Sequence, residues 1–435
     1  MSDLEEVDVS PIDEGTQENY RTWKKNAPFL YDYLSTTSLL WPSLSVQFFP
    51  ELESKKYVDK GSASDIDLAN TTSGEEVGVS YHRLLIGTFT LNQAKVDSVS
   101  ILRLPFYTDL NKRIDINKLN YTPERGEFEL STVTKKKVQV LQKINHMGDV
   151  NRAKYMPQNP DLIASSNNMG DIVVYDRTKH PNFKIGIDDS VNKPELRLRR
   201  ADGSGDSDIF AIDWNKQAEG ILVSGDIDGR INLYDIKRDF NSKDQEFINS
   251  SSSYETPGNA GVNDTEWIPN HDSIFSTVDE SGWLRLYDIR TSTQDPTFSV
   301  KLGNSGVNSV CTNPGNSSYI ATGDSDGLVS VLDVRTQEPV DTLSNVFESS
   351  ITQLKWHNTY HNILTGSSTD KSIKILDLAK EHEERVLFAH GGHMLGVNDF
   401  DWCLQDDWLI SSVADDNSLH VWKPSSKIVK EYSST

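Results

Sequence analysis

Closely spaced histidines and clustered aspartates are the parts of this sequence whose residue types and spacing could support chemistry. The one close pair among ten histidines is His390 and His393, in the segment AHGGHMLGVND. Zinc sites complete a tetrahedron with further histidine, thiolate or carboxylate ligands. No such ligand set accompanies this pair in the sequence, so we predict that the two histidines are structural and that the chain binds no metal.

Paired carboxylates could instead catalyse glycoside hydrolysis. Almost all of the aspartates, however, stand in short turns, where aspartate is favoured because it hydrogen-bonds the local backbone. The sequence contains no phosphate-binding glycine loop followed by Lys-Ser or Lys-Thr, and no nucleophile elbow. We therefore predict that the chain is not an enzyme and needs no cofactor.

The turns recur because the chain is built of repeats. Six segments end alike, and their last positions are 59, 53, 45, 44 and 46 residues apart: Asp176, Asp235, Asp288, Asp333, Asp377 and Lys423. Six residues before each stands a turn residue, and most of these are Gly or Asn, which accept positive φ: Gly170, Gly229, Gly282, Gly327, Lys371 and Asn417. Each unit contains about four short strands, which is typical of WD-repeat blades in a β-propeller.

A seventh, degenerate unit precedes these six. Residues 44–50, 82–89, 97–104 and 137–146 supply its four strands. We predict an all-β fold, a seven-bladed WD-repeat β-propeller with an N-terminal α-helix, because ring closure removes exposed sheet edges. Two modes of closure stay open: the strand at 44–50 belongs to the first blade, or it pairs with the outer edge of the last blade.

A segment of helical periodicity precedes the ring. Its apolar residues follow three- and four-residue steps, and they are Tyr20, Trp23, Ala27, Leu30, Tyr31 and Leu34. Pro28 predicts a kink or a helix end near Ala27. We predict a disordered acidic N-terminus over 1–15, a helix packed on the propeller over 16–36, the propeller over 37–424 and a fraying C-terminal tail over 425–435. Polar stretches at 51–80, 107–136, 183–207 and 241–258 are expected to be surface loops.

The charge balance restricts the partners. The 435 residues include 43 Lys+Arg and 65 Asp+Glu, so the formal net charge is −22. This charge opposes binding to phosphate backbones, and we expect no direct contact with DNA. No run approaches the roughly 18 apolar residues of a membrane helix, so no membrane partner is expected. Two cysteines exclude a disulfide scaffold.

Carboxylates should gather at one end of the propeller. The turn between the second and third strands of a blade opens on the same face as the loop that enters the next blade. The turns carry Asp226, Asp228, Asp279, Glu280, Asp324, Asp326, Asp370, Asp415 and Asp416, and the entering loops carry Asp149, Asp206, Asp208 and Asp264. We predict a negative ring at this mouth of the channel. Two interpretations of these carboxylates stay open: they only stabilise the local turns, or they bind a basic peptide in a salt-sensitive way.

At this point the chain resembles a known family. The segments ENYRTWKKNAPFLYDYL, LLWPSLSVQFFP, GDVNRAKYMPQNPDLIA, DRTKHP, LRLR and HGGHMLGVNDFDW are similar to those of the histone-binding WD-repeat proteins, the retinoblastoma-associated and Msi1-like chaperone subunits. The similarity runs in order from about residue 18 to residue 424. YDYL, QFFP and HMLGVND look most like the small subunit of chromatin assembly factor 1.

The resemblance implies two binding sites. The mouth site would take the extended basic tail of histone H3, with Phe210 as an aromatic wall, and comprises Asp149, Asn151, Arg152, Asp208, Phe210, Asn308 and Asp415. The edge site would hold the first helix of histone H4 in a groove, and comprises Phe29, Leu30, Leu34, Glu381, Glu383, Glu384, Leu387 and Phe388. This chain departs from the family at Asn263 and Ser350, where acidic residues are common, and in a shortened acidic loop, DLAKEHEERVLF.

The resemblance implies a non-enzymatic histone H3–H4 binding subunit of chromatin assembly factor 1, acting in replication-coupled nucleosome assembly. Its expected compartment is the nucleus, with the cytoplasm as a second one. Its expected partners are histones H3 and H4, the larger subunits of that factor, and histone acetyltransferase or deacetylase complexes. The alternatives are the WD-repeat subunit of the type B histone acetyltransferase or of another chromatin-modifying complex and, from another class, a generic WD-repeat adaptor such as a ubiquitin-ligase substrate receptor. The WKKN and WPSL segments disfavour the adaptor, since a generic propeller has no need of them.

Overall fold

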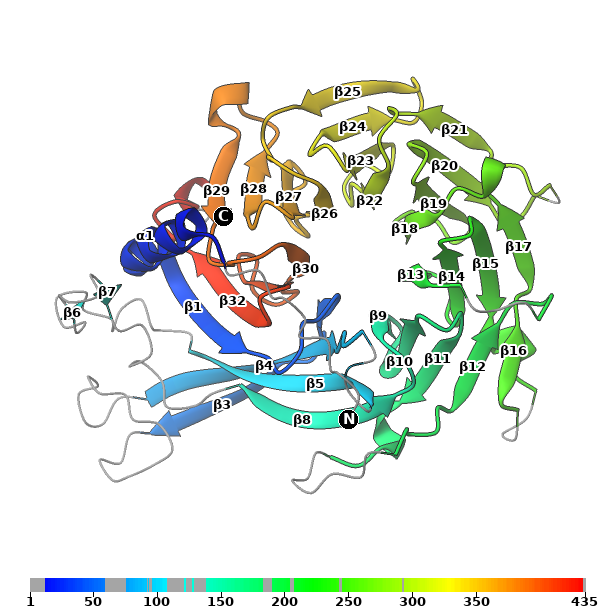
Figure 1. The fold of residues 1–435 in the computed structure, drawn as a ribbon, viewed down its shortest axis with the longest axis horizontal. Coiled ribbons are helices and arrows are strands. Elements are labelled where there is room, and N and C mark those ends of the chain that lie inside the picture. Colours follow the sequence, from blue (N-terminus) through cyan, green and yellow to red (C-terminus); the bar gives the residue numbers. More distant parts are fainter. Residues whose placement is uncertain are drawn as a thin grey trace, which may run out of the picture.

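Seven sheets stand around a central axis in the computed structural model, one propeller blade per sheet (Figure 1). The structure describes residues 12–58, 76–91, 93, 96–107, 121–122, 127–128, 138–182, 190–203, 207–241, 245–291 and 293–432. The first strand of each blade lies nearest the axis, and the later strands follow outward. The prediction of a seven-bladed β-propeller with one N-terminal helix is confirmed.

The first three blades carry the additions to the basic four-strand pattern. Blade 1 contains β2 (Val46–Phe48), β4 (Glu76–Gly87), β5 (Asp97–Tyr107) and β8 (Gln139–His146), and β3 (Glu53–Val58) pairs with β4. Blade 2 contains β9 (Val150–Met156), β10 (Asn159–Asn167), β11 (Ile172–Asp176) and β12 (Leu196–Arg199). Blade 3 contains β13 (Ile209–Trp214), β14 (Ile221–Asp226), β15 (Arg230–Asp235) and β17 (Ser252–Glu255). The connection from β15 to β17 forms α2 (Ile236–Asp239) and β16 (Phe247–Asn249), and β16 pairs in parallel with β12 as a fifth strand of blade 2.

Blades 4 to 6 follow the basic pattern. Blade 4 contains β18 (Val262–Trp267), β19 (Ile274–Asp279), β20 (Trp283–Asp288) and β21 (Phe298–Lys301). Blade 5 contains β22 (Val307–Thr312), β23 (Tyr319–Asp324), β24 (Val329–Asp333) and β25 (Glu338–Leu343). Blade 6 contains β26 (Ile351–Trp356), β27 (Ile363–Ser368), β28 (Ile373–Asp377) and β29 (Val386–His390). All six predicted turn residues, from Gly170 to Asn417, have positive φ.

Blade 7 is made from both ends of the chain. Its strands are β30 (Val397–Trp402), β31 (Ile410–Ala414), β32 (Ser418–Pro424) and, on the outside, β1 (Tyr31–Ser38). β1 pairs antiparallel with β32 from Tyr31 opposite Pro424 to Ser38 opposite Ser418. Of the two predicted modes of closure, the strand within 44–50 therefore belongs to blade 1, and a strand that the sequence analysis missed completes the last blade.

The N-terminal helix is shorter than predicted. α1 (Glu14–Leu30) begins after Asp13, whose carboxylate accepts a hydrogen bond from the Thr16 amide, so the helix start lies inside the segment predicted to be disordered. Residues 1–11 lie outside the described residues. Pro28 lies inside the helix, which ends two residues later at Leu30, and the predicted helix over 31–36 is instead β1.

Two further boundaries need correction. The stretches predicted as loops contain strands, among them β3, β12, β16 and β17, and the short hairpin of β6 (Tyr121–Thr122) and β7 (Glu127–Phe128). β7 lies beside α1. The C-terminal segment does not fray as far as Tyr432: Val429 is buried, and the Tyr432 hydroxyl bonds the Asp377 carboxylate. No helix in the described part of the chain is long and apolar enough to cross a membrane.

Side chains of the innermost strands join each blade to the next. At the closing junction, Asp399 and Asp401 of blade 7 accept hydrogen bonds from the amides of Val46 and Phe48 in blade 1, at 2.9 and 2.8 Å. Bonds of the same kind run from Ala153 N to Ser45, Tyr155 N to Gln47, Trp267 N to Asp213, Val310 N to Asp264, Thr312 N to Glu266 and Leu354 N to Ser309. The ion pairs Lys154–Asp213 and Lys355–Asp401 join blades 2 to 3 and 6 to 7. We call this set the junction ladder.

Candidate functional site

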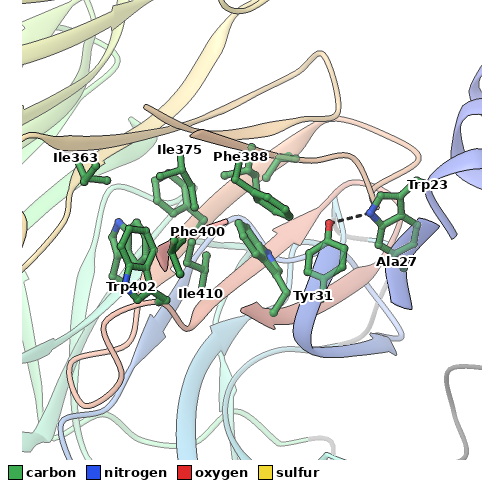
Figure 2. Packing of buried hydrophobic residues seen from close by; sticks show 14 residues of the cluster. Trp23, Ala27, Tyr31, Ile363, Ile375, Phe388, Phe400, Trp402 and Ile410 are labelled. Carbon is green, nitrogen blue, oxygen red and sulfur yellow. Dashed lines mark hydrogen bonds between the residues drawn. The ribbon is translucent and has the colours of Figure 1, made fainter. Parts of the chain in front are cut away.

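The edge site is built around the attachment of α1 to blade 7. Trp23, Ala27 and Tyr31 are buried in one cluster with Phe388 of β29 and Trp422 of β32, as Figure 2 shows for the labelled part of that cluster. These three residues lie four positions apart, so they follow one side of α1 and its continuation into β1. The docking of the helix is therefore part of the hydrophobic core of the last blade.

A chain of hydrogen bonds runs from α1 into the blade. The Trp23 indole N–H donates to the Tyr31 hydroxyl at 2.8 Å, so the Tyr31 O–H is left to donate to Nδ1 of His390, at 2.7 Å. His390 then donates its Nε2–H to Nδ1 of His420, at 3.1 Å. Both histidines are neutral in this arrangement. Burial lowers their pKa values well below the ordinary value, and the neighbouring histidines add to the effect.

One ring nitrogen from each of His390, His393 and His420 lies within 4.8 Å of the other two, a cluster of which the sequence analysis identified only the first pair. His393 is bonded through its two nitrogens to Ser418 and Ser412, and Asp416 lies 3.8 Å away, although we predicted no carboxylate neighbour. The rings of His393 and His420 are stacked with centroids 4.1 Å apart, so their in-plane lone pairs do not converge on one point. The geometry suits a hydrogen-bonded relay better than a metal site.

The predicted apolar residues of the edge site fall into three groups. Phe29, in the last turn of α1, is 56% exposed. Leu30, Leu34 and Leu387 are partly buried against the cluster. Phe388 is only 5% exposed and contacts the Tyr31 ring, so its assignment to the open surface of a groove was wrong: it belongs to the core beneath.

The predicted carboxylates of the edge site form one short turn. Glu381 precedes the 3₁₀ turn His382–Glu384, which leads directly into β29. Glu381, Glu383 and Glu384 are all exposed. Among the described residues no cation forms an ion pair with any of them, whereas the flanking Lys380 and Arg385 pair with Glu431 and Asp341. This surface combines an apolar floor with available negative charge.

At the mouth, most of the predicted turn carboxylates are structural. Asp226 accepts hydrogen bonds from the amides of Asp228 and Arg230, and Asp279 and Asp324 bond the amides two and four residues ahead in the same way. Asp149 is buried and accepts bonds from the amides of Thr90 and Leu91, at 2.8 and 3.0 Å. Its predicted role as an open carboxylate is therefore wrong. Asp206 lies outside the described residues.

A smaller set of carboxylates carries the exposed charge of the mouth. Asp228, Glu280, Asp326 and Glu348 stand in turns and loops of blades 3 to 6, and we call them the acidic arc. Asp415 of blade 7 is exposed too, and its carboxylate accepts a bond from the Asn398 side chain at 2.8 Å. Asp208 is half-buried, and its burial, then the charge of Asp149, raise the pKa of its carboxyl.

Asparagines stand at the β-bulge near the start of several innermost strands. The side-chain amides of Asn263, Asn308 and Asn398 donate to main-chain carbonyls of the next blade, those of Val307, Ile351 and Ser43. Asn308 thus joins blades 5 and 6, and its amide group is not free. Asn151 occupies the same position in blade 2 and is only 2% exposed. Neither its amide oxygen nor its nitrogen has a hydrogen-bond partner among the described residues.

Arg152, the residue after Asn151, makes the contacts to other blades. Its Nε donates to the carbonyl of Phe210 in blade 3 at 3.2 Å, and its Nη1 lies 3.4 Å from the side-chain oxygen of Gln353 in blade 6. Arg152 therefore reaches across the channel between blades that are not neighbours in the ring. Phe210 is half-buried at the bulge position of β13. The sequence analysis assigned the right strands to this mouth. It did not distinguish the polar side chains that are exposed from those that are hydrogen-bonded within the fold.

Comparison with known proteins adds two family models and one relative of full length. Residues 18–108 match the family described as histone-binding protein RBBP4 or a subunit of the CAF1 complex. Residues 239–422 match the β-propeller family of the nucleolar protein 10-like N-terminal domain. The histone-binding protein MSI1 of Saccharomyces cerevisiae is 33% identical over 445 residues, which span 98% of this chain and 97% of the yeast protein.

The buried histidines make stability depend on pH. A histidine titrates near pH 6.5 in the unfolded chain, whereas His390 and His420 stay neutral in the fold, so the unfolded state binds more protons below that pH. We expect the unfolding free energy to fall by about 1.4 kcal/mol per pH unit for each of them as the pH drops below 6.5. In urea titrations between pH 6.5 and 5, His420→Gln should remove about one such contribution from the slope, and the exposed-site control His382→Gln should not. An unchanged slope for His420→Gln would contradict the neutral buried pair.

Proposed function

This chain belongs to the Msi1-like family of histone-binding WD-repeat proteins, and from this membership we infer that it binds histones H3 and H4 as a non-catalytic subunit of a chromatin complex. The observation that carries the proposal is the similarity to the yeast protein over 98% of the chain, which includes both candidate sites. The family is one of binding proteins, so no reaction is assigned to this chain.

We propose that the edge site binds the first helix of histone H4. An amphipathic helix in a groove needs apolar contacts on one side and charge pairing on its flanks. Phe29 with the partly buried Leu30, Leu34 and Leu387 supplies the apolar contacts. The three exposed glutamates before β29 supply negative charge for the basic flank of the helix.

We propose that the mouth site binds the extended tail of histone H3. The acidic arc and Asp415 attract lysine and arginine side chains, and this attraction is screened by salt. Arg152, held by Phe210 and Gln353, limits how deeply a cationic side chain can enter.

Chromatin assembly factor 1 is the complex that we propose for this protein, with nucleosome assembly in the nucleus as its process. The matched family description, which names the CAF1 complex, supports this choice. The type B histone acetyltransferase or another chromatin-modifying complex is the alternative. A generic adaptor is disfavoured because the matched region 18–108 includes most of α1 and all of β1, elements that a ring of ordinary repeats does not need.

Phe29→Ala tests the edge site. Because Phe29 is exposed, the substitution should leave the ring folded and lower the affinity for a peptide of the first H4 helix by about tenfold, as expected for losing a buried aromatic contact. Val340→Ala, at an equally exposed apolar residue of β25, is the matched control. Titration calorimetry with both variants is the measurement, and equal H4 affinity for Phe29→Ala and wild type would sink the assignment.

Charge reversal of the acidic arc tests the mouth site. Reversal at Asp149 would break the fold, so we choose the exposed Glu280→Lys with Asp326→Lys. At low salt, the affinity for an H3 tail peptide should fall at least about tenfold, and its dependence on salt should become shallower. Asp272→Lys with Glu338→Lys makes the same charge change at exposed positions away from the mouth, in the loop from β18 to β19 and at the start of β25, and should have little effect. An affinity for the H3 tail peptide that responds neither to these charges nor to salt would rule out electrostatic binding at the mouth.

Co-purification with a tagged chain from nuclear extract tests the complex. We expect mass spectrometry to recover H3, H4 and two larger chromatin-assembly subunits. Histones with an acetyltransferase instead would keep the histone sites and replace the complex. Recovery without histones would overturn the proposed function.

A further inference from the structure

Exposed apolar side chains gather on the mouth face beside blades 1 and 2. Leu40 stands in the loop that enters β2, Leu91 in the turn from β4 to β5, and Met169 in the turn from β10 to β11. Their side chains are 85%, 63% and 45% exposed. All three belong to the loops and turns that open on the same face as the acidic arc, and none has a role in the two sites described above.

The segments that carry these residues adjoin one another around the mouth. The amide of Leu39, next to Leu40, donates to the Asn417 carbonyl, and the Phe89 amide donates to the Pro42 carbonyl at 3.0 Å. A Cβ atom placed on Gly148 would lie 3.4 Å from the sulfur of Met169, and the next residue, Asp149, holds the amide of Leu91. We call the three exposed residues, together with three half-buried apolar neighbours, the apolar arc: Leu40, Leu91 and Met169 with Trp41, Pro42 and Phe89.

Leu91 is the strained member of the apolar arc. Its φ is +50°, whereas every other non-glycine residue with positive φ in the described chain is an Asn, Gln or Lys. A leucine is disfavoured in this conformation, and the buried Asp149 carboxylate holds it there by accepting the amides of Thr90 and Leu91. The fold thus fixes an apolar side chain in solvent at a cost, and such strain concentrates where ligands bind.

The apolar arc and the acidic arc divide the mouth between them. The apolar arc covers blades 1 and 2, and the acidic arc covers blades 3 to 6. Arg200 and Arg230, which border the acidic arc, are paired with Asp226 and Asp202 and so do not neutralise it. A ligand that matches the whole face has basic side chains at one end and an apolar side chain at the other.

We infer that the apolar arc binds an apolar side chain of the same extended segment whose lysines and arginines bind the acidic arc. This inference rests on the proposed peptide binding at the mouth, and it adds a selection rule. Among basic segments, the protein prefers those that carry an apolar residue beside the basic block. The division of the face also sets the direction in which the segment lies.

Synthetic peptides of one length test this rule by fluorescence anisotropy. One peptide has a Lys/Arg block flanked by Gly and Ser, and two others carry a single Leu at its N-terminal or its C-terminal side. We expect one of the two Leu peptides to bind about tenfold more tightly than the Leu-free peptide.

Leu91→Asn is the deciding variant. Asn tolerates positive φ, so the turn keeps its shape and its Asp149 bonds while the apolar side chain is lost. It should abolish the gain from Leu and leave the affinity for the Leu-free peptide within about twofold. Met169→Gln serves the same purpose if Leu91→Asn does not fold. Leu404→Asn, at an exposed leucine in the loop from β30 to β31 on the opposite face, is the control.

The outcomes separate the two proposals. A Leu-free peptide that binds with no gain from Leu at either end, or a gain that survives Leu91→Asn and Met169→Gln, would overturn the apolar arc and leave the acidic mouth in place. Failure of all three peptides to bind would instead remove the proposed peptide binding at the mouth, and the apolar arc with it.

Discussion

The junction ladder is the interaction on which the rest of the structure depends. Among the described strands, the seven blades are separate sheets with no strand pairing from one to the next. The ring therefore holds its shape through side chains such as Asp399 and Asp213, which accept hydrogen bonds from main-chain amides of the next blade. Apolar packing alone would allow one blade to slide along its neighbour. A carboxylate that is hydrogen-bonded to a particular amide fixes the position of one blade along the axis relative to the next. These bonds also engage many of the carboxylates in the channel. Ligand recognition is therefore left to the rim of the ring.

Closure and recognition share one segment of the chain. α1 continues directly into β1, and β1 completes the last blade against β32. The residues that bury the helix, Trp23 and Tyr31, are bonded through His390 to the same blade. A ligand that rests on Phe29 therefore contacts the element that holds the ring together, and binding there also favours the closed ring by mass action.

The repeats made the fold predictable, because turn glycines and strand lengths recur and six predicted turn residues have the expected positive φ. β1 was missed because Tyr31 and Leu34 happen to continue the helical spacing of α1. The two aspartates of a turn such as Asp226 and Asp228 look equal in sequence, yet the first bonds the backbone and only the second faces solvent. Arg152 of blade 2 bonds residues of blades 3 and 6, and no local pattern in the sequence reports contacts between segments so far apart.

The pairing of β1 with β32 sets an order of events during synthesis. β1 emerges first, yet its partner, Ser418–Pro424, emerges nearly four hundred residues later. At about 5–20 residues per second, the nascent chain carries an unpaired strand for roughly 20–80 s. An open edge of this kind is a template for pairing with other chains. The newly made protein therefore depends, for that interval, on whatever shields β1, and a chain that stops short of β32 is left with a ring that cannot close.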